Sequence, residues 1–337
     1  MLLLLLVILL NTAVAVLFKF YGKHQVSTTT AIVVNYWASA GTGSLLLGRF
    51  PVTAETLHAP WLYVTVLLGA AFFVGYQLFS YAIHHYGVTT ATVSSRMALV
   101  LAVIFAWVAF SDEQFNWVGL AGVILAFPAV YLTAAKSQNS DSRNQRSKSK
   151  NQKPKFKAAV REIEVEGPEK QQHTEENSGN EASKKGFHMG WGVLALFLIG
   201  GAQDIGRSVL SHNYVETDKE LQAVTTVHIF MAAALVGTVV LIYRLVTGKS
   251  KFSLKSVLAG LLLAGPDFFA NYLFVRVLAS DDLLPSVAVP VNNIGIVIVS
   301  VLAAYFLFKE QFGLKRVFGI VLSLLAIFLI SFKELFS

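Results

Sequence analysis

Glu113-Gln114-Phe115 recurs late in the chain as Glu310-Gln311-Phe312. The same offset carries Gly122 onto Gly319, and each copy lies between long apolar stretches. A short motif repeated together with its surroundings indicates that one ancestral unit was duplicated within the chain. This duplication decides the fold, because it fixes how the two halves of the sequence correspond.

A second match supports the duplication. The segment Leu67–Tyr76 resembles Leu263–Tyr272, with Gly69 aligned on Gly265. Its offset is one residue shorter, which a single insertion or deletion in the following loop explains. The two matches predict one unit over residues 1–135 and a second unit over residues 188–337.

The composition indicates a membrane protein. Apolar residues make up 55% of the chain and charged residues only 14%, whereas about a quarter of the residues in soluble domains are charged. A soluble helical core would leave too few polar faces for water. A transmembrane β-barrel needs alternating segments, and the run Leu2–Leu6 does not alternate. We therefore predict an all-α, polytopic membrane helix bundle.

Apolar runs long enough to cross the hydrocarbon as helices recur about ten times, with about five in each unit. The predicted spans are Leu2–Phe20, Thr28–Gly48, Trp61–Ile83, Val88–Phe110, Gln114–Ala135, Met189–Ser211, Leu221–Tyr243, Ser253–Ala279, Leu283–Phe308 and Phe312–Phe332. Because each unit has an odd number of spans, the second unit crosses the membrane in the opposite sense. The repeats are therefore predicted to be inverted, an arrangement typical of secondary transporters.

Residues 136–187 differ from the rest of the chain. They are rich in Ser, Asn, Gln, Lys and Glu and carry most of the net charge of +7. Such a segment buries too little apolar surface to offset its ordering entropy. We expect a disordered linker, either solvated or lying on anionic headgroups, and no nucleic-acid partner.

The first span could be taken for a signal peptide, since Leu2–Leu10 precedes Ala13-Val14-Ala15. A basic segment before the apolar run is missing, and cleavage would remove one member of a matched pair of spans. We expect this span to be retained.

The charges of the short loops predict how the chain is oriented in the membrane. The lysines and arginines of the short loops gather on the face that carries the linker, which predicts a cytoplasmic linker and external termini. The basic residues counted there are Lys23, Lys249, Lys251, Lys255, Lys315 and Arg316.

The matched motifs resemble a known family. Pro290 at the start of a span, Glu310 in the next loop and Gly319 in the following span form one pattern. In the first unit Glu113 and Gly122 match, while Val93 stands at the proline position. The chain resembles the drug/metabolite transporter superfamily, specifically its EamA-like ten-helix permeases. The resemblance implies a multi-pass permease of the cell inner membrane, commonly an exporter. It also implies alternating access for small metabolites or drugs, and cytoplasmic termini, in conflict with the charge rule.

Polar side chains within spans are costly in hydrocarbon and are therefore functional candidates. Asp267 follows Pro266, which we expect to open a helix break, and this carboxylate could carry a coupling proton. Asp204 and Arg207 share a helix face, either as a structural pair or as groups that handle substrate or protons. The predicted substrate-binding residues are Asp267, Asn271, Tyr272, Arg96, Gln77, Asn292, Asn293, Gln203, Asp204 and Arg207.

Other residues are expected to serve the structure. Glu113 and Glu310 are interpreted as helix starts, because a carboxylate in a first turn complements the helix dipole. Gly122 and Gly319 are interpreted as sites of close helix packing. Asn292 and Asn293 have helix association as their alternative role.

Lys19 and Arg276 lie near span ends, where they can extend to the headgroups. His228 lies within a span, and we expect it to donate an interhelical hydrogen bond.

The sequence lacks the motifs of several enzyme classes. Gly248-Lys249-Ser250 resembles the end of a nucleotide-binding loop, but Tyr243 occupies the position of the required earlier glycine. There is no H-E-x-x-H motif and no cysteine. We therefore expect a transporter that has no cofactor or metal, with a small molecule and the lipid bilayer as partners and no obligate protein partner. An integral membrane enzyme acting on a small or lipid-linked substrate is the alternative.

Overall fold

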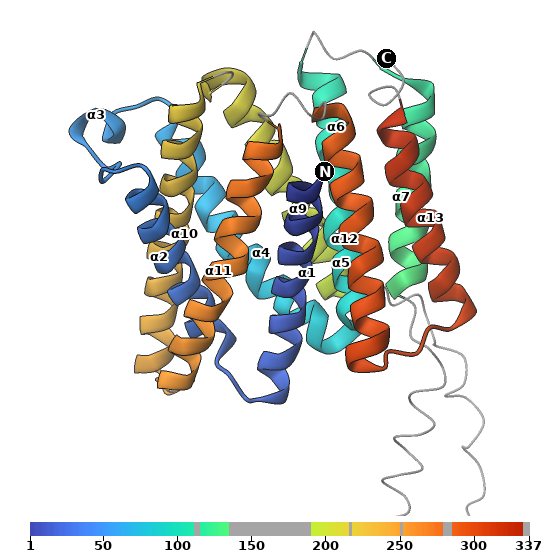
Figure 1. Cartoon of the computed structure of the whole chain (residues 1–337), viewed down its shortest axis with the longest axis horizontal. Coiled ribbons are helices and arrows are strands. Elements are labelled where there is room, and N and C mark those ends of the chain that lie inside the picture. The colour runs from blue at the N-terminus through green and yellow to red at the C-terminus, as the bar shows by residue number, and fades with distance from the viewer. Residues whose placement is uncertain (111–114, 135–189, 216–217, 250–251, 279–284, 333–337) are drawn as a thin grey trace, which may run out of the picture.

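The structure is a computed structural model, and it describes residues 1–110, 115–134, 190–215, 218–249, 252–278 and 285–332. The predicted linker over residues 136–187 and Glu113 lie outside the described residues. All regular elements among the described residues are helices (Figure 1). The first unit contains α1 (Leu2–Lys23), α2 (Thr28–Leu46), the short α3 (Ala54–Leu57), α4 (Leu62–Tyr86), α5 (Val88–Met97), α6 (Leu99–Ala109) and α7 (Trp117–Ala134). The second contains α9 (Trp191–Leu210) with a π-helical turn (Ser211–Val215), α10 (Lys219–Val246), α11 (Leu254–Leu278), α12 (Pro285–Phe308) and α13 (Leu314–Ile330).

Each predicted span corresponds to one long helix, or in the fourth span to the consecutive pair α5 and α6. Eight spans among the described residues are long and apolar enough to cross a bilayer. The other two are α2, which is rich in Thr, Ser and Gly, and α13, which has 17 residues. Both pack against qualifying helices, α2 on α10 and α13 on α7. The prediction of an all-α, polytopic bundle is confirmed.

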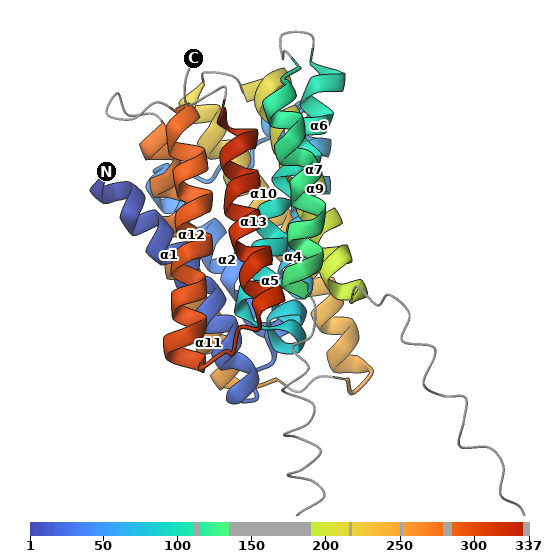
Figure 2. The same cartoon turned by 90° about the vertical axis from the view of Figure 1, so that its right-hand side faces the viewer.

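The two units run in opposite directions. In Figure 1, α1 begins in the upper half of the bundle and α13 ends near its top, whereas α7 ends and α9 begins in the lower half. Figure 2 shows the same arrangement after a quarter turn. The start of the chain and the end of α13 therefore lie towards one face, and the opposite side is called the linker face below.

The packing between the units follows the duplication. Helix α1 packs on α11 and α12, and its counterpart α9 packs on α4 and α6. Helix α2 packs on α11, as α10 packs on α4. The pairs α2–α10 and α7–α13 lie at opposite ends of the bundle (Figure 1). Each unit thus buries its inner surface mainly against the other unit, which places the centre of the protein between the two units.

Glycines allow the closest helix contacts, as membrane packing requires. A Cβ on Gly69 of α4 would lie 2.5 Å from Ala232 Cβ on α10. A Cβ on Gly122 of α7 would lie 2.8 Å from Ala326 O on α13, and one on Gly319 would lie 2.8 Å from Thr133 N on α7. The packing role predicted for Gly122 and Gly319 is therefore confirmed.

One expectation about helix breaks is wrong. Helix α11 continues through Pro266 without interruption, because a transmembrane helix tolerates the single lost hydrogen bond when neighbouring helices hold it. The interrupted span is instead the fourth, where Ala98 separates α5 from α6 and Leu101 N donates to Ala98 O at 3.0 Å. That bond spans three residues and tightens the turn.

Candidate functional site

A buried carboxylate lies where the two units meet. Asp267 on α11 is only 3% exposed. Its Oδ2 accepts a hydrogen bond from Asn35 Nδ2 on α2 at 2.8 Å, and its Oδ1 accepts one from the Tyr76 hydroxyl on α4. Asn271 Nδ2 donates to the backbone oxygen of Asp267 at 2.8 Å and lies 3.5 Å from Oδ1. We call these four residues the Asp267 cluster, and three helices from both units contribute to it.

The described residues that donate hydrogen bonds to this carboxylate are all neutral. Among the described residues, no lysine, arginine or histidine nitrogen lies within ion-pair distance of Asp267. Asn35 is completely buried, and its Oδ1 has no hydrogen-bond partner in the described structure. An ionised carboxylate accepts from the amide nitrogen of Asn35, whereas a protonated one can donate to the amide oxygen after the amide rotates. The cluster can therefore hold either form with little rearrangement.

A second polar group lies around Arg96 on α5. Its guanidinium donates to Asn11 Oδ1 on α1 at 3.1 Å and to Asn293 Oδ1 on α12 at 3.4 Å. The repeat offset matches Arg96 with Asn293, so two equivalent positions of the two units contact one another. We call these three residues the Arg96 cluster, and helices of both units contribute to it.

The three candidates on α9 have different surroundings. Gln203 Nε2 donates to Ala71 O on α4 at 2.8 Å. The Arg207 guanidinium lies over the Phe72 ring, 4.7 Å from its centroid, and makes no salt bridge with Asp204 among the described residues. The half-buried Asp204 carboxylate has no protein hydrogen-bond partner within the described ranges. The structural pair considered from the sequence therefore forms no direct ion pair among the described residues, although Asp204 lies within electrostatic range of both Arg207 and Arg96.

Among the described residues, the other predicted side chains make no hydrogen bond to either cluster. Gln77 donates to Thr29 Oγ1 at 3.0 Å, and Arg244 shares this acceptor at 2.6 Å. The Tyr272 ring stacks on Phe268 with a centroid distance of 6.0 Å, and the Arg276 guanidinium lies over it at 5.9 Å from its centroid. Asn292 is 5% exposed, and its Oδ1 has no partner among the described residues.

Three residues that form these groups were not among the predicted ones: Asn11, Asn35 and Tyr76. Each is a polar side chain within an apolar span, so the rule that singled out Asn271 and Gln77 also applies to them. Their importance depends on contacts between helices that are distant in sequence. Packing of α2 and α4 on α11 supplies those contacts.

Two interpretations of loop and span residues need correction. Glu310 does not lie in the first turn of α13, which begins at Leu314. Its carboxylate instead contacts the start of α5 and lies 3.8 Å from Lys19 Nζ. Lys19 also donates to Ile83 O at 3.3 Å, so it binds protein groups rather than extending freely to headgroups.

His228 also differs from its prediction. Its Nδ1 lies 2.9 Å from Val224 O in its own helix, and its Nε2 is buried with no partner among the described residues. The ring packs edge-on against Trp61, with centroids 5.0 Å apart. The expected interhelical hydrogen bond is therefore not observed.

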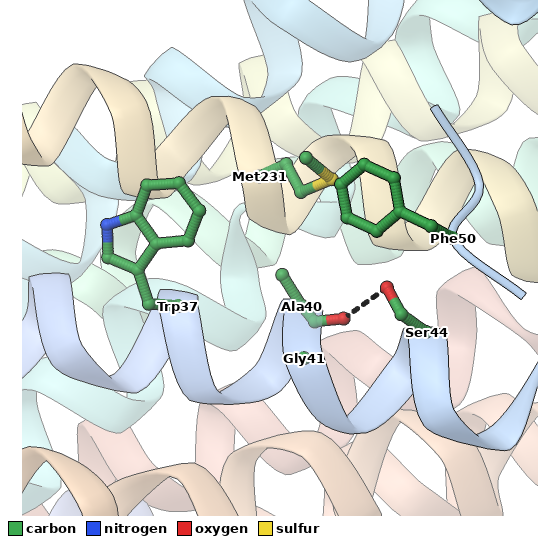
Figure 3. Close-up of a pocket in the computed structure, with 6 residues that line it drawn as sticks. All are labelled: Trp37, Ala40, Gly41, Ser44, Phe50 and Met231. Atoms are coloured by element: carbon green, nitrogen blue, oxygen red, sulfur yellow. Dashed lines mark hydrogen bonds between the residues drawn. The ribbon is translucent and has the colours of Figure 1, made fainter. Parts of the chain in front are cut away.

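A cavity of about 160 Å³ lies between α2 and α10, away from both polar clusters. Figure 3 shows Trp37 and Phe50 at its two ends and Met231 of α10 along one side. Its one hydroxyl, on Ser44, donates to Ala40 O at 2.9 Å within the helix. The indole N–H of Trp37 donates to Thr238 Oγ1 at 3.0 Å, and the other lining side chains are apolar. This cavity therefore offers no free side-chain donor that would orient a polar metabolite.

The Arg96 cluster predicts that exchanging the residues at positions 96 and 293 restores part of the stability lost when Arg96 alone is replaced. Replacing Arg96 with Asn removes the charged donor from two amides and should cost about 1.5–3 kcal/mol. The double variant Arg96→Asn/Asn293→Arg returns the guanidinium to the equivalent position of the other unit, and we expect it to recover about half of that loss. Thermal unfolding in detergent, followed by tryptophan fluorescence, measures both effects. Additive losses in the double variant would show that the two positions do not form a pair.

Comparison with known proteins agrees with this architecture. A solved crystal structure aligns over 100% of this chain and 98% of its own, with a TM-score of 0.56 and 14% sequence identity, a likeness that shows the fold. No curated protein matches the chain. The fold and its polar centre define a multi-pass, α-helical membrane protein of two inverted repeats. The profile of the EamA-like transporter family matches residues 1–135 and 209–332, which is more than half of the sequence. The chain belongs to the EamA-like transporter family.

Proposed function

We propose that this protein is a secondary transporter of the cell inner membrane that moves a small polar metabolite by alternating access. One observation carries the proposal: the polar side chains within the bundle meet where the two inverted units pack together. Asp267 binds Asn35 and Tyr76 of the first unit, and Arg96 binds Asn293 of the second. A polar centre between inverted repeats is the arrangement that carriers use for substrate and coupling ions.

The accessible charges suggest where substrate binds. Asp204 and Arg207 lie on α9 without a direct ion pair between them among the described residues, and Gln203 of the same helix contacts α4. A carboxylate and a guanidinium on one helix face suit a substrate with separated polar groups of opposite character. We assign these residues to substrate and the Asp267 cluster to the coupling proton.

A transporter is favoured over the membrane enzyme by the position of the ionisable groups. An enzyme needs an acid, base or nucleophile beside a substrate headgroup. Asp204, Asp267 and Arg96 lie instead within membrane-spanning helices. Glu310, near the linker face, contacts the α5 backbone and Lys19.

Counterflow in proteoliposomes tests the proposal. Vesicles loaded with an unlabelled metabolite should accumulate the labelled form transiently, and a panel of amino acids, nucleosides and organic cations covers the relevant chemistry. We expect exchange of at least one compound, reduced by Asp204→Asn. Chemical turnover of a panel member, with no exchange of any, would overturn the proposal in favour of the enzyme.

A further inference from the structure

The loop between α12 and α13 reaches into the other unit through Glu310. Its Oε1 accepts a hydrogen bond from Val88 N at 2.8 Å, and its Oε2 accepts one from Thr89 Oγ1 at 3.3 Å. Val88 begins α5, so a carboxylate of the second unit caps a helix of the first unit. Lys19 on α1 lies 3.8 Å from the same carboxylate. We call Glu310, Val88, Thr89 and Lys19 the linker-face latch.

Residues next to the linker-face latch leave room for the Glu310 carboxylate or add further contacts between the units. Gly87, just before α5, has a φ of +97°, and a Cβ there would lie 2.8 Å from both carboxylate oxygens of Glu310. A side chain at this position would therefore be strained and would collide with the carboxylate. Arg316 of α13 donates to Tyr86 O at 3.4 Å. Several contacts thus join the two units at one place on the linker face.

The duplicated sequence does not repeat the latch in full. The offset that matches Glu113 with Glu310 matches Val88 with Pro285. Helix α12 begins at Pro285, as α5 begins at Val88. Proline has no N–H group. At Pro285, the position matched to Val88, the main-chain donor of the linker-face latch is therefore missing.

We propose that Glu310 is a one-sided latch, which biases the resting protein towards conformations closed at the linker face. Inverted repeats exchange roles when a carrier changes its conformation, so matched contacts on the two faces would favour neither state. The unmatched N–H of Val88 breaks this balance. This inference rests on the proposed alternating access, but it concerns the resting state and requires no substrate.

The absence of cysteine makes the test direct. Cysteines replacing His85 at the end of α4 and Leu314 at the start of α13, both exposed, would carry the only spin labels. We expect Glu310→Gln to shift the ratio of short to long label distances by about tenfold towards long. Thr89→Val should give a smaller shift in the same direction.

A substitution in the second unit tests the proposed latch without changing Glu310 or its partners. Pro285→Val returns an N–H to the matched position, and we expect it to favour long distances at the linker face without lowering the unfolding temperature. Glu220→Gln removes the exposed ion pair with Arg49 and should leave the distances unchanged.

Folded Glu310→Gln protein with an unaltered distance distribution would overturn the proposed latch. If that variant fails to fold, an unaltered distribution in both Thr89→Val and Pro285→Val would overturn it. Substrate exchange that persists despite such a result would leave the proposed transport function standing.

Discussion

Asp267→Asn is expected to abolish uphill transport driven by a pH gradient while leaving substrate exchange measurable. Asparagine is nearly isosteric and can still bond to Asn35 and Tyr76, but it cannot take up or release a proton at neutral pH. A gradient of one pH unit supports about a tenfold substrate ratio for each coupled proton. The variant should lose this accumulation entirely, and proteoliposomes with an imposed pH gradient measure the loss.

Two control variants distinguish the loss of proton coupling from a general loss of transport. Asp267→Glu retains a protonatable group and should recover part of the accumulation. Asp218→Asn removes a carboxylate that caps α10 outside the bundle and should leave accumulation unchanged. Full accumulation in Asp267→Asn vesicles would show that this carboxylate does not carry the proton, whereas loss of both accumulation and exchange would assign Asp267 to substrate binding.

The architecture could be predicted from the sequence because two strong constraints act together. Bilayer thickness sets the length of each apolar run, and the repeated Glu-Gln-Phe sets the correspondence between the units. Helix α5 begins at Val88, where the fourth span was predicted to begin, and α12 ends at Phe308, where the ninth was predicted to end. Boundaries next to apolar runs follow from hydrophobicity alone.

The candidate site could be predicted only in part. The contact between Asp267 and Asn271 follows from helical periodicity, since the residues are four apart on one helix. Asn35 and Tyr76 meet Asp267 only because α2 and α4 contribute to the same centre. No local pattern in the sequence encodes which of several polar faces will meet between helices.

Two interpretations failed because each considered one helix in isolation. Pro266 was expected to break α11, but surrounding helices hold the chain in helical form. Glu310 was assigned to the nearest following helix, whereas it caps α5 in the other unit. Here the partner of a loop residue lies in the opposite repeat, because the two units pack on one another.

Gly122→Ala and Gly319→Ala are expected to destabilise the pair α7–α13, each by about 1–3 kcal/mol. Each new Cβ would lie 2.8 Å from main-chain atoms of the facing helix, so the two backbones must separate along much of their contact. The helix-forming advantage of alanine, about 1 kcal/mol, offsets only part of this cost.

The matched controls are Gly41→Ala and Gly265→Ala, since a Cβ at either glycine meets nothing within 4 Å. We expect the controls to unfold at the same temperature as the parent protein or higher, and the two test variants to unfold lower in detergent and lipid alike. Equal unfolding temperatures in all four variants would mean that α7 and α13 do not approach so closely, and that the repeated glycine has a role other than packing.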